Sequence, residues 1–473
     1  MRHLAWLAVA LLLGAALRFH DLGGPSLWMD EGFTWMVASQ PVSEMPEVAT
    51  RFEKHPPLHY LAVRAALLAG GRDEFWLRFP AALAGTLTII AIWALGMRVG
   101  GVGPLAALFL AVSGLHVLMS RDARGYGMAG LFITVACVLW LRVLERREPR
   151  VAAAWLVCGV LAAYTHYLAF FALGWMWLVG VFVLTGPDRM KWLGVPGLVA
   201  LVYAPWAPIM LRQAQTPSPG HPPPAWDAFL EILFTQAAGF TLNFTPWRLP
   251  VIPPSLQPLA AWLTLIVLAA GALILAWPAG ESARRVLAVF VGTVVSVFLV
   301  ARFTSLGIHE TKYMVLVSPL FWTLVAAGCS VPGHRVGWAL AGLFLAVNLT
   351  SSLNAITQPE WSRQDFRGAI RYLAEHGRGD DLLLVTSDWA MPAVSYYLPQ
   401  RMRIASLNAG QAAGFGATGL SSRVWLMRAS ASLSDPADEV GRRLREAGWR
   451  PTREWRTYRR NPDFAVDLKL YVR

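Results

Sequence analysis

The chain has 473 residues, of which 56% are hydrophobic and only 15% are charged. Because soluble proteins carry about 25% charged residues, this composition excludes an ordinary soluble protein. The 41 basic and 29 acidic residues leave a net charge of +12. Much of the excess lies in short breaks between apolar runs, so we interpret it as cytoplasmic charge that orients a membrane protein, and we expect no nucleic-acid partner.

Apolar runs of near-membrane length repeat from the N-terminus to about residue 355. A helix of about 20 apolar residues crosses the hydrocarbon core of a bilayer. The runs therefore predict an all-α polytopic membrane domain over residues 1–355. We expect about eleven spans, at 4–20, 79–98, 102–118, 127–144, 151–165, 167–185, 192–211, 257–277, 286–303, 313–330 and 336–353.

The distribution of Lys and Arg predicts the orientation of these spans. With Arg2 in the cytoplasm, the breaks that contain Arg98, Arg142 to Arg150 and Arg335 also face the cytoplasm, as the positive-inside rule requires. An odd number of spans then places the tail, residues 358–473, on the outer side. The long loops 19–78 and 212–256 fall on that side too.

The tail differs in composition from the rest of the chain, because it contains no run long enough to cross a membrane. In some stretches its apolar residues recur with the period of a helix, and in others they follow patterns typical of strands. It predicts a small soluble α/β domain over 358–473, with helices at 363–375 and 435–447 and strands at 381–387, 424–427 and 464–472.

Two adjacent carboxylates, Asp30 and Glu31, lie just past the first span in the sequence SLWMDEGFTW (26–35). A carboxylate at the edge of a membrane can have a raised pKa and act as a general base. The alternative is a solvated loop in which Asp30 is the N-cap of a helix.

The sequence RFEKHPPLHY (51–60) places Glu53, Lys54 and His55 beside two prolines, with His59 a turn later. Proline biases the residue before it to an extended backbone. Glu53, His55 and His59 leave open a site for a divalent metal ion, although the spacing matches no standard metal site. The alternative is a rigid turn before a helix that lies on the membrane.

An arginine-containing turn follows the third predicted span in SRDARGYGM (120–128). Arg121 and Arg124 stand out, because the other short outer breaks carry little charge. The planar fork of donors in a guanidinium suits phosphate, and a lipid-linked sugar presents phosphate at this depth. The alternative is a pair of interfacial arginines whose charged ends reach the membrane surface.

Two more polar groups occupy outer turns: His166 in AYTHYLAFF (163–171), and His309, Glu310, Lys312 and Tyr313 in GIHETKYM (307–314). Each has a structural alternative, either a hydrogen-bonded histidine or an ordinary polar turn. The predicted topology nevertheless places all five polar groups on the same outer side, and a single site is the simplest explanation.

The ordered motifs LWMDE, HPPL, RFPA (78–81), DARGYGM and KY together resemble the GT-C superfamily of polyprenyl-phosphate-sugar glycosyltransferases. The branch they resemble is the bacterial one similar to protein O-mannosyltransferases and to the lipid A aminoarabinose transferase. The resemblance covers about residues 1–330. It implies an inverting transfer from a polyprenyl-phosphate sugar to an unknown extracytoplasmic acceptor, at the outer face of the bacterial inner membrane, with a metal requirement that varies among members.

The resemblance also implies roles for individual residues. Asp30 would position or deprotonate the acceptor, and Glu31 would support it. Arg124 would hold the leaving phosphate, with Tyr126 beside it and Arg121 nearby. Lys312 stands where many members have Arg, and His55 stands where some have Lys, with Lys54 adjacent. We expect catalytic residues Asp30 and Glu31, phosphate-binding residues Arg121, Arg124, Tyr126 and Lys312, and substrate-binding residues Lys54, His55, His166 and Tyr313.

Two other functions remain open on the sequence alone. A transporter or flippase of a lipid-linked glycan could use the same arginines, but it predicts polar or broken elements near the bilayer midplane. The candidate residues lie instead at the membrane edge, and the sequence shows no internal repeat. A scaffold protein with a partner-binding tail would leave the clustered polar loops unexplained.

Overall fold

The protein is described by a computed structural model over residues 2–215, 224, 227–239, 241, 280–304, 311–330, 335–399, 402–408, 411, 422–457 and 464–473. The predicted span 257–277 lies outside these ranges, as do His309, Glu310 and much of the predicted loop 212–256.

The chain divides into two compact units, and each is described by itself. Unit 1 consists of Met1–Leu22, Pro41–Arg72 and Trp76–Ala355. Unit 2 consists of Gly23–Gln40, Asp73–Phe75 and Ile356–Arg473. The second unit therefore combines the C-terminal part of the chain with two short segments from the first outer loop.

The apolar runs of unit 1 form helices, because a helix satisfies its backbone N–H and C=O groups within one segment, as hydrocarbon demands. The long helices are α1 (Arg2–Phe19), α5 (Glu74–Arg98), α8 (Tyr126–Arg146), α9 (Pro149–Thr165), α10 (Ala169–Val183), α16 (Gly280–Phe303) and α18 (Arg335–Thr357). The shorter elements are α3 (Met45–Phe52), α4 (Leu58–Gly70), α6 (Gly103–Val112), α7 (Gly114–Ser120), α11 (Gly186–Leu193), α12 (Val195–Tyr203), α13 (Ala207–Gln215), α14 (Asp227–Ala238), η2 (Thr311–Val317) and α17 (Ser318–Cys329).

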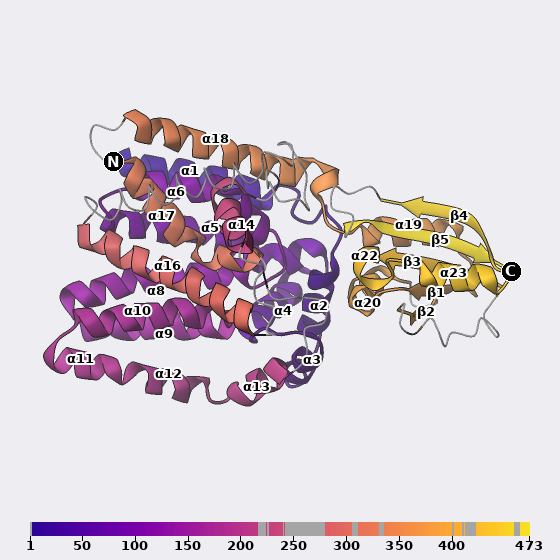
Figure 1. The fold of residues 1–473 in the computed structure, drawn as a ribbon, viewed down its shortest axis with the longest axis horizontal. Helices are drawn as coiled ribbons and strands as arrows, with labels where there is room; N and C mark the ends of the chain where they lie inside the picture. The colour runs from indigo at the N-terminus through magenta and orange to yellow at the C-terminus, as the bar shows by residue number, and fades with distance from the viewer. Residues whose placement is uncertain are drawn as a thin grey trace. The chain divides into compact units, whose positions relative to one another are not determined.

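Apart from 257–277, each predicted span coincides with one or more of these elements. Of the helices in the described ranges, five are long and apolar enough to cross a membrane, or up to seven if each of two bent pairs is one span. The total of about eleven spans stays a prediction. Figure 1 shows α8, α9 and α10 side by side, and their apolar residues belong to one buried core.

The third predicted span is bent, because α6 and α7 meet at an angle of 63°. The break frees backbone carbonyls, and the buried guanidinium of Arg18 binds them. Its N–H groups donate to the carbonyl oxygens of Leu110 at 3.0 Å and Ala111 at 3.1 Å, and its Nη2 lies 2.9 Å from His116 Nδ1. A buried charge is tolerated where hydrogen bonds satisfy its donors, so Arg18 stabilises the bend.

Unit 2 contains a five-stranded sheet in the order β2-β1-β3-β5-β4. Strands β1 (Leu382–Val385), β2 (Arg403–Ser406) and β3 (Arg423–Ala429) are parallel. Strand β5 (Val466–Val472) pairs antiparallel with β3, and β4 (Arg450–Arg456) pairs antiparallel with β5. Helices α19 (Phe366–His376), α20 (Met391–Tyr397) and α23 (Glu439–Glu446) lie around this sheet (Figure 1).

Side chains of the central strands alternate between two cores, as the period of a strand requires. Leu383 and Val385 pack in the core that contains α19 and α20, whereas Leu382 and Leu384 pack in the core that contains α23. The sheet is thus covered on both faces. Asp365 begins α19 as its N-cap, since its carboxylate accepts the N–H of Gly368 at 2.8 Å.

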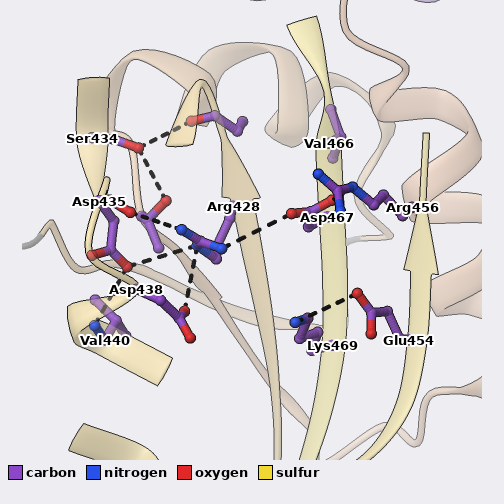
Figure 2. A network of polar contacts seen from close by, with 12 residues as sticks. Arg428, Ser434, Asp435, Asp438, Val440, Glu454, Arg456, Val466, Asp467 and Lys469 are labelled. Atoms are coloured by element: carbon purple, nitrogen blue, oxygen red, sulfur yellow. Dashed lines mark hydrogen bonds and ion pairs between the residues drawn. The ribbon is translucent and has the colours of Figure 1, made fainter. Parts of the chain in front are cut away.

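An ion-pair network links α23 and the loop before it to the sheet. Figure 2 shows Arg428 between Asp435 and Asp438 on one side and Asp467 on the other. Arg428 Nη2 also donates to the backbone oxygen of Asp435 at 2.8 Å, and Asp467 pairs with Arg456 at 2.8 Å. Burial raises the pKa of Asp467 despite these cations. The network connects β3, β4 and β5 through side chains.

The structure confirms the predicted small sheet domain at the C-terminus. The helix expected at 363–375 is α19, and the strands expected at 381–387, 424–427 and 464–472 are β1, β3 and β5. The helix expected at 435–447 is shorter and corresponds to α23. Strands β2 and β4 and helix α20 were not predicted.

Candidate active site

Polar side chains from four separate segments of unit 1 gather in one place. Glu53 and His55 follow α3, and Arg124 and Tyr126 lie where α7 gives way to α8. His166 lies between α9 and α10, and Tyr313 and Lys312 belong to η2. Four of the five polar groups predicted from the sequence therefore contribute to this group of residues, which we call the Arg124 cluster.

The centre of the cluster is a buried ion pair between Arg124 and Glu53. Both Nη atoms of Arg124 donate to the two carboxylate oxygens of Glu53, with Nη2 to Oε2 at 3.2 Å. His55 Nε2 lies 3.8 Å from the same Oε2. A two-point pair of this kind fixes the plane of the guanidinium, so Arg124 is oriented before any ligand arrives.

Glu53 is itself held by Gln213, a buried residue of α13. The side-chain amide of Gln213 donates to the carbonyl oxygens of Ala49 at 3.1 Å and Glu53 at 3.0 Å. Tyr167 donates its hydroxyl hydrogen to the amide oxygen of Gln213 and accepts a hydrogen bond from Trp206 Nε1 at 2.9 Å. Sequence reasoning missed Gln213, because an amide at the end of an apolar run does not reveal partners 160 residues away.

Four rings form an aromatic wall beside the ion pair. The ring centres of His55 and His166 are 4.9 Å apart, and Tyr126 lies 5.6 Å from His166. Tyr313 lies 6.0 Å from Tyr126 and 5.9 Å from His166. Centres at these separations are typical of packed aromatic pairs. Residues far apart in sequence thus present flat apolar faces with polar edges to one another.

His166 has a buried nitrogen without a hydrogen-bond partner among the described residues. Its Nδ1 accepts the backbone N–H of Leu168 at 3.2 Å, which places the proton of a neutral ring on Nε2. Nε2 is buried and makes no hydrogen bond to the described part of the chain. Because a buried donor without an acceptor costs free energy, Nε2 is a candidate contact for a ligand.

The histidines of the cluster are neutral at physiological pH. Burial, followed by Arg124, the neighbouring histidines and Lys312, holds the pKa of His55 well below its usual value. Burial and the same two cations lower the pKa of His166 to about 3. Both rings lie outside the helices that flank them. The cations of the cluster are therefore Arg124, whose charge is balanced by Glu53, and Lys312.

The remaining predicted phosphate and substrate ligands of unit 1 have different surroundings. Arg121 Nη1 donates to the carbonyl oxygens of Leu17 and Arg18 at 3.1 Å and of His20 at 2.7 Å. Since α1 ends at Phe19, this cation caps the negative end of a helix. Lys54 is half-buried, and burial lowers its pKa. The Nζ of Lys312 lies 5.5 Å from the ring centre of Tyr313.

The predicted catalytic carboxylates belong to unit 2. Asp30 and Glu31 lie in the first turn of α2 (Met29–Ala38). Glu31 is buried, and its Oε2 accepts the backbone N–H of Trp28 at 3.4 Å. Glu31 thus caps the N-terminus of the helix. Asp30 is half-buried and lies inside the helix, so the alternative in which Asp30 is the N-cap is wrong: Trp28 holds that position.

The residues considered as metal ligands have other partners in the structure. Within the described ranges, no group of three or more His, Cys, Asp or Glu side chains is arranged to hold a metal ion. Of the three residues considered for this role, Glu53 is paired with Arg124, and His55 Nε2 lies 3.8 Å from Glu53 Oε2. His59 Nε2 lies 3.0 Å from the carbonyl oxygen of Ala123.

Residues 54–209, which are 156 of the 473, match the family of dolichyl-phosphate-mannose-protein mannosyltransferases. The matched segment contains Lys54, His55, Arg124, Tyr126 and His166. A search of curated proteins finds no match.

Solved structures of similar fold cover nearly the whole chain. ArnT from Cupriavidus metallidurans bound to undecaprenyl phosphate has 13% identity and a TM-score of 0.55, covering 99% of this chain and 97% of that one. The oligosaccharyltransferase of Archaeoglobus fulgidus in complex with zinc and sulfate has 12% identity and a TM-score of 0.52, covering 90% and 68%. The predicted resemblance to GT-C glycosyltransferases is confirmed. The chain is an integral membrane protein with a GT-C-like fold.

Proposed function

We propose that this protein transfers a glycosyl group from a polyprenyl-phosphate sugar to an acceptor at the outer face of the bacterial inner membrane. The observation that carries the proposal is the Arg124 cluster, in which four chain segments supply a fixed guanidinium, a second cation and a wall of rings. The undecaprenyl phosphate bound to the ArnT of similar fold supports a polyprenyl-phosphate donor.

The cluster suits the phosphate and the sugar of such a donor. Because His55 and His166 are neutral, the cations available to a phosphate are Lys312 and Arg124, the latter paired with Glu53. A guanidinium presents its donors as a planar fork, and Glu53 sets the plane of that fork. The Nε2–H of His166 and the faces of Tyr126 and Tyr313 can contact sugar hydroxyls and the sugar ring.

The reaction needs one base and one stabilised leaving group. An acceptor hydroxyl oxygen attacks the anomeric carbon from the face opposite the phosphate, and the bond between that carbon and the phosphate oxygen breaks. The electron pair of that bond leaves with the polyprenyl phosphate, whose charge Arg124 and Lys312 stabilise. The hydroxyl proton passes to Asp30, and the anomeric configuration inverts.

In this mechanism Asp30 receives the proton of the acceptor hydroxyl, and Glu31 holds the helix that carries Asp30. Glu31 is buried and caps α2, so its carboxylate holds the first turn of the helix in which Asp30 lies. Glu31 is therefore proposed to support the geometry of the loop without taking the proton. The C-terminal part of unit 2 and the long outer loops are where acceptor specificity is expected to reside.

The proposal is tested with purified protein, a panel of radiolabelled polyprenyl-phosphate sugars and a membrane extract that supplies acceptors. We expect label to leave the polyprenyl fraction with the wild type and not with Asp30→Asn, and the labelled product to reveal the acceptor. If no donor of a broad panel loses label, the transferase is rejected in favour of a transporter of lipid-linked glycans. If Asp30→Asn transfers at the wild-type rate, the base is assigned to the wrong residue.

A further inference from the structure

The helix that carries Asp30 is embedded in unit 2. Residues Gly23–Gln40, which contain α2, belong to the same compact unit as Ile356–Arg473. The two segments are separated by more than 300 residues of sequence. The contacts between them are specific enough to show how α2 is held.

The closest contact is between two helix backbones. Gly32 of α2 lies against Ala393 of α20, and a Cβ atom on Gly32 would lie 2.4 Å from the backbone nitrogen of Ala393 and 2.8 Å from its Cα. Such distances are far inside van der Waals contact, so only glycine permits this approach. Because backbone atoms cannot rotate away as a flexible side chain can, any larger residue must move α2. Gly32 is two residues from Asp30.

Tyr397 and Arg367 hold the chain before α2. The hydroxyl of Tyr397 accepts the backbone N–H of Leu27 at 2.8 Å and donates to the carboxylate of Glu74 at 2.6 Å. Arg367 donates to the carbonyl oxygens of Gly23 at 3.1 Å and Gly24 at 2.7 Å and also binds Glu74. Both ends of the first outer loop are thus attached to helices α19 and α20.

Trp28, the N-cap of α2, is held by side chains of the C-terminal segment. The guanidinium carbon of Arg363 lies 3.6 Å above the centre of the Trp28 ring, and the ring of Phe464 meets it edge-on at 6.4 Å. Farther along α2, Trp35 packs edge-on against Tyr396 at 5.2 Å. Contacts before, at the start of and within α2 therefore fix the helix on the α/β domain.

We propose that the C-terminal α/β domain positions the carboxylate of Asp30 through α2, with Gly32 as the main positioning residue and Tyr397 as the second. This inference rests on the proposed function, since it takes Asp30 to be the group that receives the proton. The domain is then part of the catalytic apparatus. It need not contact the substrate to control the rate, because a shift of about 1 Å in a reacting group can lower a rate about 100-fold.

The test compares three variants of the full-length protein: Gly32→Ala, Tyr397→Phe and Gly379→Ala. The last is a matched glycine-to-alanine control in the same unit, because a Cβ on Gly379 would meet nothing within 4 Å. We expect Gly32→Ala to lower kcat of transfer about 10- to 100-fold with little change in KM for the donor. Tyr397→Phe should lower kcat about 3- to 10-fold, and Gly379→Ala should leave it unchanged.

Two further readouts separate positioning from damage to the fold. Hydrogen exchange in Gly32→Ala should quicken at the amides of α2 and remain slow in β1 and β3. The Asp30→Glu substitution already misplaces the carboxylate. In that background, Gly32→Ala should lower kcat by a much smaller factor than in the wild type, because the effects of two substitutions that act through one group are not additive.

Each outcome decides one question. The proposal that α2 positions Asp30 is wrong if Gly32→Ala retains wild-type kcat. It is also wrong if Gly32→Ala lowers kcat by the same factor with and without Asp30→Glu. Either result leaves open that the protein is a transferase. If β1 and β3 also exchange quickly, Gly32 supports the whole domain and the inference again fails. If Asp30→Asn is fully active, the assignment of the base to Asp30 fails instead, and the exchange of α2 amides still reports how α2 is held.

Discussion

The Arg124 cluster of unit 1 and helix α2 of unit 2 hold their functional side chains by different means. In the cluster, a buried ion pair orients the guanidinium, and a neighbouring amide holds the carboxylate partner. In α2, a contact between two backbones at Gly32 sets the position of the helix, and the carboxylate of Asp30 follows. The position of Arg124 depends on an ion pair, whereas the position of Asp30 depends on close packing between two helices. They should therefore fail under different substitutions.

Removing the carboxylate at the centre of the cluster should have the largest effect on stability. Glu53→Ala leaves Arg124 buried without its two-point partner, and breaking such a pair costs about 3–5 kcal/mol. The thermal unfolding midpoint of the purified protein in mild detergent measures this loss. Glu145→Ala is the matched control, because its pair with Arg98 is partly exposed and should contribute about 1 kcal/mol or less. Equal losses in the two variants would contradict the role given to the Glu53–Arg124 pair.

Acidification should destabilise the Arg124 cluster. The pKa of His166 is lowered to about 3 in the folded protein, against about 6.5 in the unfolded chain. Between these values the unfolded state binds a proton that the folded state does not, so stability falls as the pH falls. His55, whose pKa is lowered in the same direction, adds to the effect.

Lowering the pH from 6.5 to 4.5 should cost about 2 kcal/mol from His166 alone. Unfolding midpoints at several pH values measure it, and His166→Gln should flatten the profile. A profile in which His166→Gln and the wild type lose stability in parallel would mean that another group titrates.

Arg121 and Arg124 are only three residues apart, but their side chains have different environments. Arg121 caps the C-terminal end of α1. We therefore expect Arg121→Ala to lower stability by about 1 kcal/mol with less than a tenfold effect on kcat. Arg124→Ala should lower kcat by at least about 100-fold, as the loss of a charge-stabilising group does. Equal losses of activity would show that both arginines contact the donor phosphate.

Much of the fold is predictable from the sequence, because hydrophobic period and run length are local properties. Helix α19 and strands β1, β3 and β5 have clear apolar patterns, and their positions agree with the prediction. Strand β4 has the sequence RPTREWR and is exposed along most of its length, so it lacks the alternation that identifies a strand. It forms because β5 offers a free edge for pairing.

The candidate site is predictable in its residue types and not in its internal pairing. Motifs and topology indicated Glu53, His55, Arg124 and His166, but the ion pair joins residues 71 positions apart. Similarly, the sequence does not distinguish Gly32 from any other glycine in a short helix, because its contact with Ala393 exists only in the folded structure. Such contacts depend on the tertiary structure, which no local pattern encodes.

The most direct test of the account measures donor binding and single-turnover transfer on the same preparation of Asp30→Asn. If Asp30 takes the acceptor proton and the Arg124 cluster holds the donor, the variant should bind a polyprenyl-phosphate sugar as tightly as the wild type. Its transfer rate should fall by about 100-fold or more, as the loss of a general base predicts. A variant that transfers at the wild-type rate, or that loses binding and transfer together, would contradict this division of roles.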